Sequence, residues 1–158
     1  KIATSLYPVE PRIRLLIIGF CPLHSTLDEV KRQLADKPYI TLTGGDRFVP
    51  HEDILSTIHS ADFGIIAYPP NPSTANAIPT KLYEYLGCQL PILLIDNPTW
   101  TERCKPYPAA ITFDPVRIDT GRILEDILAK SFFRTPPEDV YWESEEVKLL
   151  AALQVILP

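Results

Sequence analysis

The sequence lacks several features that mark large classes of protein. Its three cysteines, Cys21, Cys88 and Cys104, stand far apart in 158 residues and show no CxxC spacing. This scattered, odd-numbered set argues against a zinc site or a disulfide framework and favours reduced cytosolic thiols. The longest apolar runs, residues 15–18 and 91–95, are far shorter than the roughly 20 residues of a membrane-spanning helix. No charged and then apolar leader opens the chain, so nothing in it predicts secretion.

Basic clusters and catalytic signatures are also missing. The net charge is −5 and no Lys/Arg stripe is present, so nucleic acid is not expected as a partner. The GxSxG, HExxH, GxxxxGK[ST] and GxGxxG patterns are absent, which argues against hydrolase, zinc-protease, P-loop and dinucleotide-oxidoreductase functions. Asp96 has no acidic neighbours, which excludes a response-regulator receiver domain. We therefore expect neither a metal ion nor a cofactor.

What the sequence does contain is typical of one globular domain. The 46% hydrophobic and 22% charged residues are ordinary for a soluble protein. A chain of 158 residues supplies a sizeable core. Most of the 17 prolines separate the predicted elements. We expect a single domain over residues 1–158.

Strand and helix patterns alternate along the chain. Apolar runs predict strands at residues 12–20, 39–43, 63–68, 91–95 and 109–113. Residues 12–20 have the continuous apolar character of a strand buried on both faces. Helical patterns follow at residues 26–34, 50–59, 79–88, 100–103, 120–132 and 143–157. This alternation predicts an α/β fold with a doubly wound parallel sheet.

Two helix starts carry specific signals. Thr26 and Glu29 have the spacing of a capping box before an apolar helical repeat. Pro79 is predicted as the first residue of the helix over residues 79–88, since proline favours that position. Residues 1–7 resemble the tail of a helix, from which we expect an upstream strand and an N-terminally truncated domain.

The segment after the third predicted strand has the strongest chemical character. A loop over residues 69–78, containing Ser73 and Asn76, enters a helix bearing Thr80, Lys81 and Glu84 on one face. The amino end of a helix attracts phosphate through its unpaired N–H groups and its dipole. Lys81 adds a cation, and the Glu84 carboxylate can accept hydrogen bonds from two sugar hydroxyls. A nucleotide-diphosphate sugar needs both kinds of group.

Several motifs resemble, in order, the donor domain of glycosyltransferases of the group 1, family 4 type with the GT-B fold. PTKLYEYLGCQLPILL is similar to the helix and strand that follow the family's donor loop. IRLLIIG resembles its central strand, and HSADFGIIAY the strand before that loop. TLTGG with Val49 resembles its base-binding turn, and YWESEEVKLLAAL its closing helix.

The resemblance implies a Rossmann-like C-terminal domain that binds a nucleotide-diphosphate sugar for transfer to an unknown acceptor. It places Glu84 on the ribose hydroxyls, with Thr80, Lys81, Ser73 and Asn76 also at the donor. Gly44, Gly45 and Val49 would lie against the base. Asn76 stands where the family has the first of two glutamates, so no catalytic residue is assigned and the stereochemical outcome stays open. The family's pyrophosphate-binding Arg/Lys pair would lie in the missing upstream segment.

The resemblance also implies a partner and a setting. The acceptor domain would be the missing N-terminal half of the same chain, and this half alone would be inactive. A metal-independent hexosyltransferase in the cytoplasm, acting in polysaccharide biosynthesis, is the expected whole enzyme. Peripheral association of that enzyme with the inner membrane face is left open.

Two other functions remain open at this point. One is a non-catalytic α/β interaction domain, which the amide at Asn76 favours. Another is a different GT-B enzyme, such as a nucleotide-sugar epimerase. Individual residues also have simpler interpretations. Glu84 could pair with Lys81 on a solvated helix, and Ser73 and Asn76 could shape a turn. Gly44 and Gly45 could likewise form an ordinary turn. We expect Trp100 and Trp142 to be core anchors rather than stacking surfaces.

Overall fold

The computed structural model describes residues 1–69, 71 and 77–156. Tertiary contacts divide the chain into two compact units, Lys1–Ser60 and Ala61–Pro158. Each unit has its own small parallel sheet. The single domain expected from the sequence stays a prediction.

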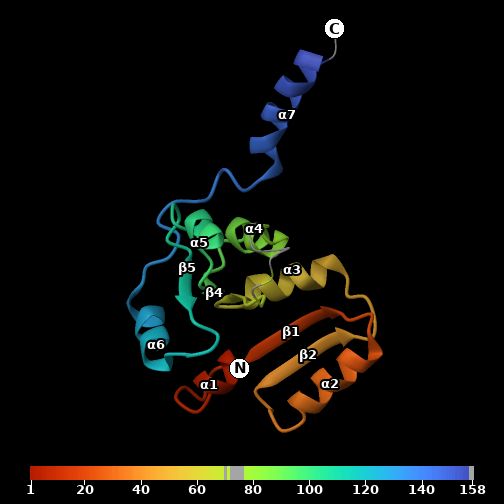
Figure 1. Cartoon of the computed structure of the whole chain (residues 1–158), viewed down its shortest axis with the longest axis vertical. Coiled ribbons are helices and arrows are strands. Elements are labelled where there is room, and N and C mark those ends of the chain that lie inside the picture. The colour runs from red at the N-terminus through yellow and green to blue at the C-terminus, as the bar shows by residue number, and fades with distance from the viewer. Residues whose placement is uncertain (70, 72–76, 157–158) are drawn as a thin grey trace. The chain divides into compact units, whose positions relative to one another are not determined.

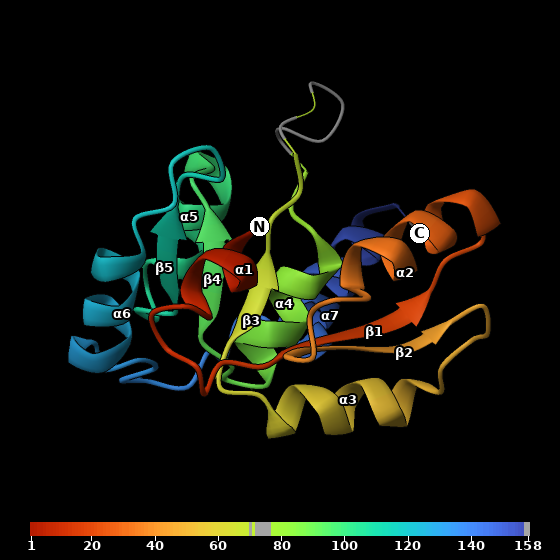
Figure 2. The same cartoon turned by 90° about the horizontal axis from the view of Figure 1, so that it is seen from below.

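The first unit contains a pair of parallel strands with helices beside it (Figure 1). Its elements are α1 (Ile2–Leu6), β1 (Leu15–Phe20), α2 (His24–Leu34), β2 (Ile40–Gly45) and α3 (His51–Ser60). The register runs from Leu15 opposite Ile40 to Phe20 opposite Gly45. Figure 2 shows the strand pair with α2 on one side and α3 on the other. Buried Leu27 anchors α2 over β2, where its side chain covers Gly45.

Two predictions for this unit are wrong in detail. Helix α2 begins at His24 with Leu23 as its N-cap, and no side chain caps it. Thr26 is therefore already inside the first turn, and Glu29 accepts a 2.8 Å hydrogen bond from Gln33 Nε2 further along the helix. The predicted capping box does not form.

Strand β1 is not buried on both faces. Leu16 is 48% exposed and Phe20 is 41% exposed, while the residues between them are half-buried. Full burial requires neighbours on both edges and layers on both faces. The sheet that contains β1 has two strands, so β1 pairs along one edge only.

The second unit contains a three-stranded parallel sheet in the order β3–β4–β5. Its elements are β3 (Gly64–Ile66), α4 (Thr80–Gly87), β4 (Ile92–Ile95), α5 (Pro98–Cys104), β5 (Ala110–Phe113), α6 (Thr120–Ala129) and α7 (Trp142–Ile156). All four residues of the central strand β4 are buried, as the apolar run predicts for a strand between two others. Helices α4, α5 and α6 contact the sheet.

The core of this unit gathers aliphatic side chains from the sheet and from α4 and α6. The fully buried members are Ile66, Leu82, Leu86, Ile92, Leu94, Ile111 and Ile123. Each such side chain contributes about 1.5–3 kcal/mol when it is removed from water. Leu82 and Leu86 come from α4, so this burial fixes the rotation of α4 about its axis.

Caps set the starts of two further helices. The Asn97 side chain accepts from Trp100 N at 3.2 Å, and the Asp119 side chain accepts from Arg122 N at 3.0 Å. Both bonds satisfy backbone donors that the first turn of a helix leaves without a partner. Helices α5 and α6 therefore begin close to the residues that the sequence predicts.

The architecture is mixed α/β, and every strand pairing is parallel. The strands in the described part of the chain form two sheets, and the single doubly wound sheet expected from the sequence stays a prediction. Over residues 1–69, 71 and 77–156, no helix combines the length and apolar character needed to cross a bilayer.

Candidate ligand-binding site

Thr80, Lys81 and Glu84 share the first turns of α4, the helix that follows β3. Lys81 Nζ donates to Glu84 Oε2 at 2.6 Å. The two side chains are 36% and 28% exposed, and Thr80 is exposed. The spacing therefore brings the predicted cation and carboxylate together, and in this structure they bind each other.

The N-cap of α4 is Pro79, whose side chain makes no cap hydrogen bond. Pro79 is not the first helical residue as predicted, because its ψ of 140° is extended rather than helical. The first turn of α4 carries no acidic residue. The positive end of the helix dipole at Thr80 is thus not offset by a carboxylate in that turn.

Glu84 gives the next turn a negative character. Burial raises the pKa of the Tyr85 phenol, and the nearby negative groups of Tyr68 and Glu84 raise it further. Burial and then the Glu84 carboxylate also raise the pKa of the Cys88 thiol. A phosphate would be repelled at Glu84, whereas hydroxyl donors would be attracted there. Thr80 and Glu84 are four residues apart, which corresponds to about 6 Å along the helix axis. Helix α4 therefore offers a positive environment at its amino end and a negative one at the next turn.

Trp100 holds both chain segments that flank the loop before α4. Its Nε1–H donates to the Ala77 carbonyl at 2.7 Å, and its ring meets that of Tyr68 edge-on at 6.1 Å. Trp100 is 3% exposed, which confirms its prediction as a core anchor. Its role at the loop was missed, since sequence spacing does not show that residues 77 and 100 are neighbours. Ser73 and Asn76 lie outside the described residues.

Trp142 was also predicted as a core anchor, and that prediction is wrong. It begins α7 and is 63% exposed. Most of the described side chains that follow it in α7 are exposed as well. Aromatic character alone does not bury a residue when no other element covers its helix.

Gly44 and Gly45 form a sharply constrained end to β2 in the first unit. Their φ angles are +87° and +78°, in the region that favours glycine. A Cβ on Gly44 would lie 2.5 Å from both the Gly19 carbonyl oxygen and Val49 Cγ2. Val49 thus packs over Gly44, and the two residues predicted to face a base do lie together. Contact of this turn with a base stays a prediction.

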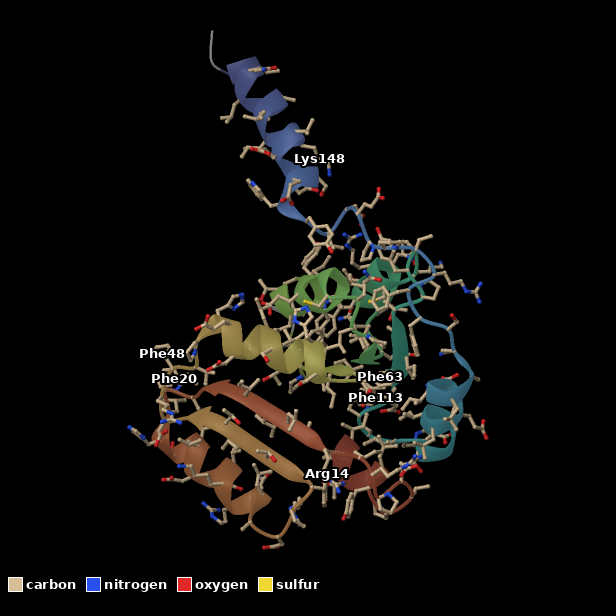
Figure 3. The ribbon with its side chains drawn as sticks, turned by 180° about the vertical axis from the view of Figure 1, so that it is seen from behind. Arg14, Phe20, Phe48, Phe63, Phe113 and Lys148 are labelled. Carbon is tan, nitrogen blue, oxygen red and sulfur yellow. The ribbon has the colours of Figure 1, made fainter. Side chains whose placement is uncertain are left out.

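An aromatic pair beside this turn was missed at the sequence level. The rings of Phe20 and Phe48 are 4.3 Å apart and tilted by 30°. Figure 3 shows them side by side, with Phe20 at the carboxyl end of β1. Their sequence separation hides the pair, because only the parallel register of β1 with β2 brings the two loops together.

A shallow pocket of about 80 Å³ lies elsewhere, at the carboxyl end of β5. Its lining residues are Phe113, Asp114, Arg117, Asp119, Arg122 and Ile123. Arg122 donates to the Thr112 carbonyl, and Arg117 pairs with Asp114 at 3.8 Å. None of the lining residues belongs to α4, so this pocket does not enclose the predicted donor residues.

No metal site emerges from the described ranges. Over residues 1–69, 71 and 77–156, no cluster of three or more His, Cys, Asp or Glu side chains could hold an ion. Cys21, Cys88 and Cys104 are free thiols. Ligand binding without a metal stays a prediction.

The predicted donor residues fall into two groups. Thr80, Lys81 and Glu84 belong to the second unit, whereas Gly44, Gly45 and Val49 belong to the first. Comparisons with protein-family models, with curated proteins and with solved structures gave no match to this chain. The glycosyltransferase resemblance therefore stays a prediction from the sequence.

Proposed function

We propose that this chain is the nucleotide-diphosphate-sugar-binding domain of a glycosyltransferase of the GT-B type, similar to group 1, family 4. The observation that supports this most is the first half of α4. A first turn without an acidic residue, the Lys81 ammonium and the Glu84 carboxylate follow one another there, on the helix that comes after the parallel strand β3. In open parallel α/β sheets, ligands bind beyond the carboxyl ends of the strands.

The binding roles follow from charge. The diphosphate would accept from the free N–H groups of the first turn and from Lys81 Nζ. Glu84 would accept from the two ribose hydroxyls. Both roles require the Lys81–Glu84 pair to open, and a part-exposed pair of this kind stabilises by only about 0–1 kcal/mol. Hydrogen bonds to charged groups are worth about 1.5–3 kcal/mol, so ligand contacts outweigh the pair.

The proposal extends to the fold. We propose that the strands of both units belong to one doubly wound, Rossmann-like sheet in the whole protein. The pairings among the described residues are parallel, as that fold requires. A crystal structure with one continuous sheet would support this arrangement, and two separate sheets would contradict it.

The whole enzyme would contain an acceptor domain upstream of Lys1. Sugar transfer to an acceptor would take place only with that domain present, so this chain alone would bind nucleotide without catalysis. The cytoplasm, or the inner face of a membrane, is the proposed location of the enzyme.

The test is a binding measurement on the chain and on Glu84→Gln. Calorimetry with UDP, GDP and their sugars should show binding to the unaltered chain. Loss of the charged acceptor should weaken that binding about 10- to 150-fold, the equivalent of 1.5–3 kcal/mol. Glu102→Gln is the matched control, because Glu102 of α5 pairs with Lys105, the C-cap residue of that helix three positions later. The affinity of the Glu102→Gln variant should equal that of the unaltered chain.

A second candidate is a non-catalytic interaction domain. It is favoured by the closed Lys81–Glu84 pair and by a pocket that α4 does not line. A folded sample that binds neither UDP, nor GDP, nor their sugars would support this candidate and contradict the transferase proposal.

A further inference from the structure

The pocket at the carboxyl end of β5 lies where that strand ends and α6 begins (Figure 1). Phe113 is buried and Ile123 is fully buried, so these two side chains form an apolar floor. Two arginines and two aspartates around the floor are exposed and form a charged rim. One water molecule needs roughly 10–15 Å³, so a volume of about 80 Å³ accepts a group of several atoms.

The two guanidinium groups of the rim keep hydrogen-bond donors for a ligand. A guanidinium carries five N–H donors. Arg122 uses one terminal nitrogen for the Thr112 carbonyl, a bond that holds its side chain at the end of β5. Arg117 Nε lies 3.8 Å from Asp114 Oδ2, beyond hydrogen-bond distance. Because guanidinium matches carboxylate and phosphate in shape and charge, these donors suit an oxyanion.

The two carboxylates of the rim are only partly used by the main chain. Asp114 Oδ1 accepts from Val116 N at 2.7 Å, and Asp119 Oδ1 accepts from Arg122 N at 3.0 Å. Hydrogen bonds from the main chain of Val116 and Arg117 lower the pKa of Asp114, so this carboxylate is ionised near neutral pH. A second oxygen on each carboxylate can accept from a ligand hydroxyl. The carboxylates therefore repel a bare anion but favour one that also carries hydroxyl groups.

We propose that this pocket is a second binding site, for a hydroxylated organic anion such as a sugar phosphate or a sugar acid. Arg117 and Arg122 bind the phosphate or carboxylate group. Asp114 and Asp119 accept hydrogen bonds from hydroxyls on the neighbouring carbons. The described lining residues come from β5, α6 and the turn between them, so the site is separate from α4 and goes beyond the proposed function.

The test is an NMR titration of the labelled whole chain, followed at the amides of Val116, Arg117 and Arg122. The probes are glucose 6-phosphate, glucuronate, glucose and inorganic phosphate. We expect the two sugar anions to shift these amides at lower concentration than either of the other probes, and the tighter of the two identifies the anionic group. Equal binding of glucose would overturn the role of the anion, and equal binding of inorganic phosphate would overturn the role of the hydroxyls. No shift with either sugar anion would overturn the site.

Two arginine variants test the rim. Arg122→Gln removes the guanidinium and should weaken binding of glucose 6-phosphate about 10- to 150-fold. Arg117→Gln changes a side chain that is 90% exposed, so the fold is kept and the affinity should fall about 2- to 5-fold. Arg32→Gln is the matched control, because Arg32 pairs with Glu29 three residues earlier, as Arg117 does with Asp114. Its affinity should equal that of the unaltered chain, and the same result for both rim variants would overturn the proposal.

Two carboxylate variants complete the test. Asp114→Asn keeps an oxygen for Val116 N but removes the negative charge. It should strengthen binding of inorganic phosphate and reduce the preference for glucose 6-phosphate, and an unchanged preference would overturn the role of the hydroxyls. Glu84→Gln alters α4 and should leave the affinity for glucose 6-phosphate unchanged, so this site and the proposed donor site can fail separately. Loss of that affinity in Glu84→Gln, with shifts at Thr80 and Lys81, would place the ligand at α4 and overturn the pocket.

Discussion

Trp100 makes its contribution through one hydrogen bond as well as through its buried ring. Its Nε1–H is the donor to the Ala77 carbonyl, a bond that links α5 to the residues before α4. We therefore regard Trp100 as a positioning residue for the start of α4.

Trp100→Phe tests this role. The change keeps an aromatic ring but removes the donor, and it also leaves a cavity on the indole side. We expect a loss of about 1–3 kcal/mol in the free energy of unfolding, measured by urea denaturation. Trp142→Phe should change it by less than about 0.5 kcal/mol, because Trp142 is exposed. Equal effects of the two changes would contradict the anchoring role.

At the scale of elements, an ionic cluster ties the segment before α7 to α5. Arg103 of α5 donates to Asp139 Oδ2 at 2.7 Å, and the Tyr107 hydroxyl donates to Asp139 Oδ1. The Arg103 guanidinium also lies 5.3 Å from the centre of the Tyr83 ring, which belongs to α4. Arg103 thus links α4, α5 and the final connection.

This cluster predicts a pH dependence of stability. The hydrogen bonds from Arg103 and then Tyr107 lower the pKa of Asp139 below its usual value near 3.8. Because the pKa is lowered in the folded state, the ionised carboxylate stabilises the fold at pH values above the unfolded pKa of about 3.9. This contribution is lost as the pH falls below that value. Because Asp139 is more than half exposed, the contribution is only about 0.5–1 kcal/mol.

Asp139→Asn should therefore lower stability near neutral pH and flatten its decline below about pH 4. Tyr107→Phe removes one donor and should produce a smaller effect in the same direction. Thermal melts between about pH 2.5 and 7 would measure both. Parallel pH curves for Asp139→Asn and the unaltered chain would contradict the assignment.

The elements themselves were largely predictable from local patterns. The apolar run at residues 91–95 predicts β4, and the structure places Ile92–Ile95 in the centre of a sheet. Pro79 marks the start of α4 to within one residue. The errors concern Thr26, Trp142 and the burial of β1, where the outcome depends on which elements pack nearby. Residue spacing along the chain does not contain that information.

At the scale of the whole molecule, sequence periodicity predicts parallel strands but not how many sheets they form. Over residues 1–69, 71 and 77–156 the strands pair in groups of two and three, because pairing is decided by contacts between distant segments. The candidate site shows the same limit. The sequence brings Lys81 and Glu84 together through helical spacing, whereas the Trp100–Ala77 and Phe20–Phe48 contacts require the tertiary fold.

Net charge acts against the proposed ligand. The chain carries −5, which repels a nucleotide diphosphate at long range. Binding must therefore come from the local positive groups at the start of α4. This makes α4 the place where the central proposal is decided.

The most direct measurement follows the backbone amides of the labelled chain by NMR during titration with GDP. We expect the largest shifts at the amides of Thr80 and Lys81, with the Glu84 side chain losing its bond to Lys81. Inorganic diphosphate should shift the same two amides, since it carries the anionic groups alone. Shifts confined to other helices, or none at saturating GDP, would contradict the account.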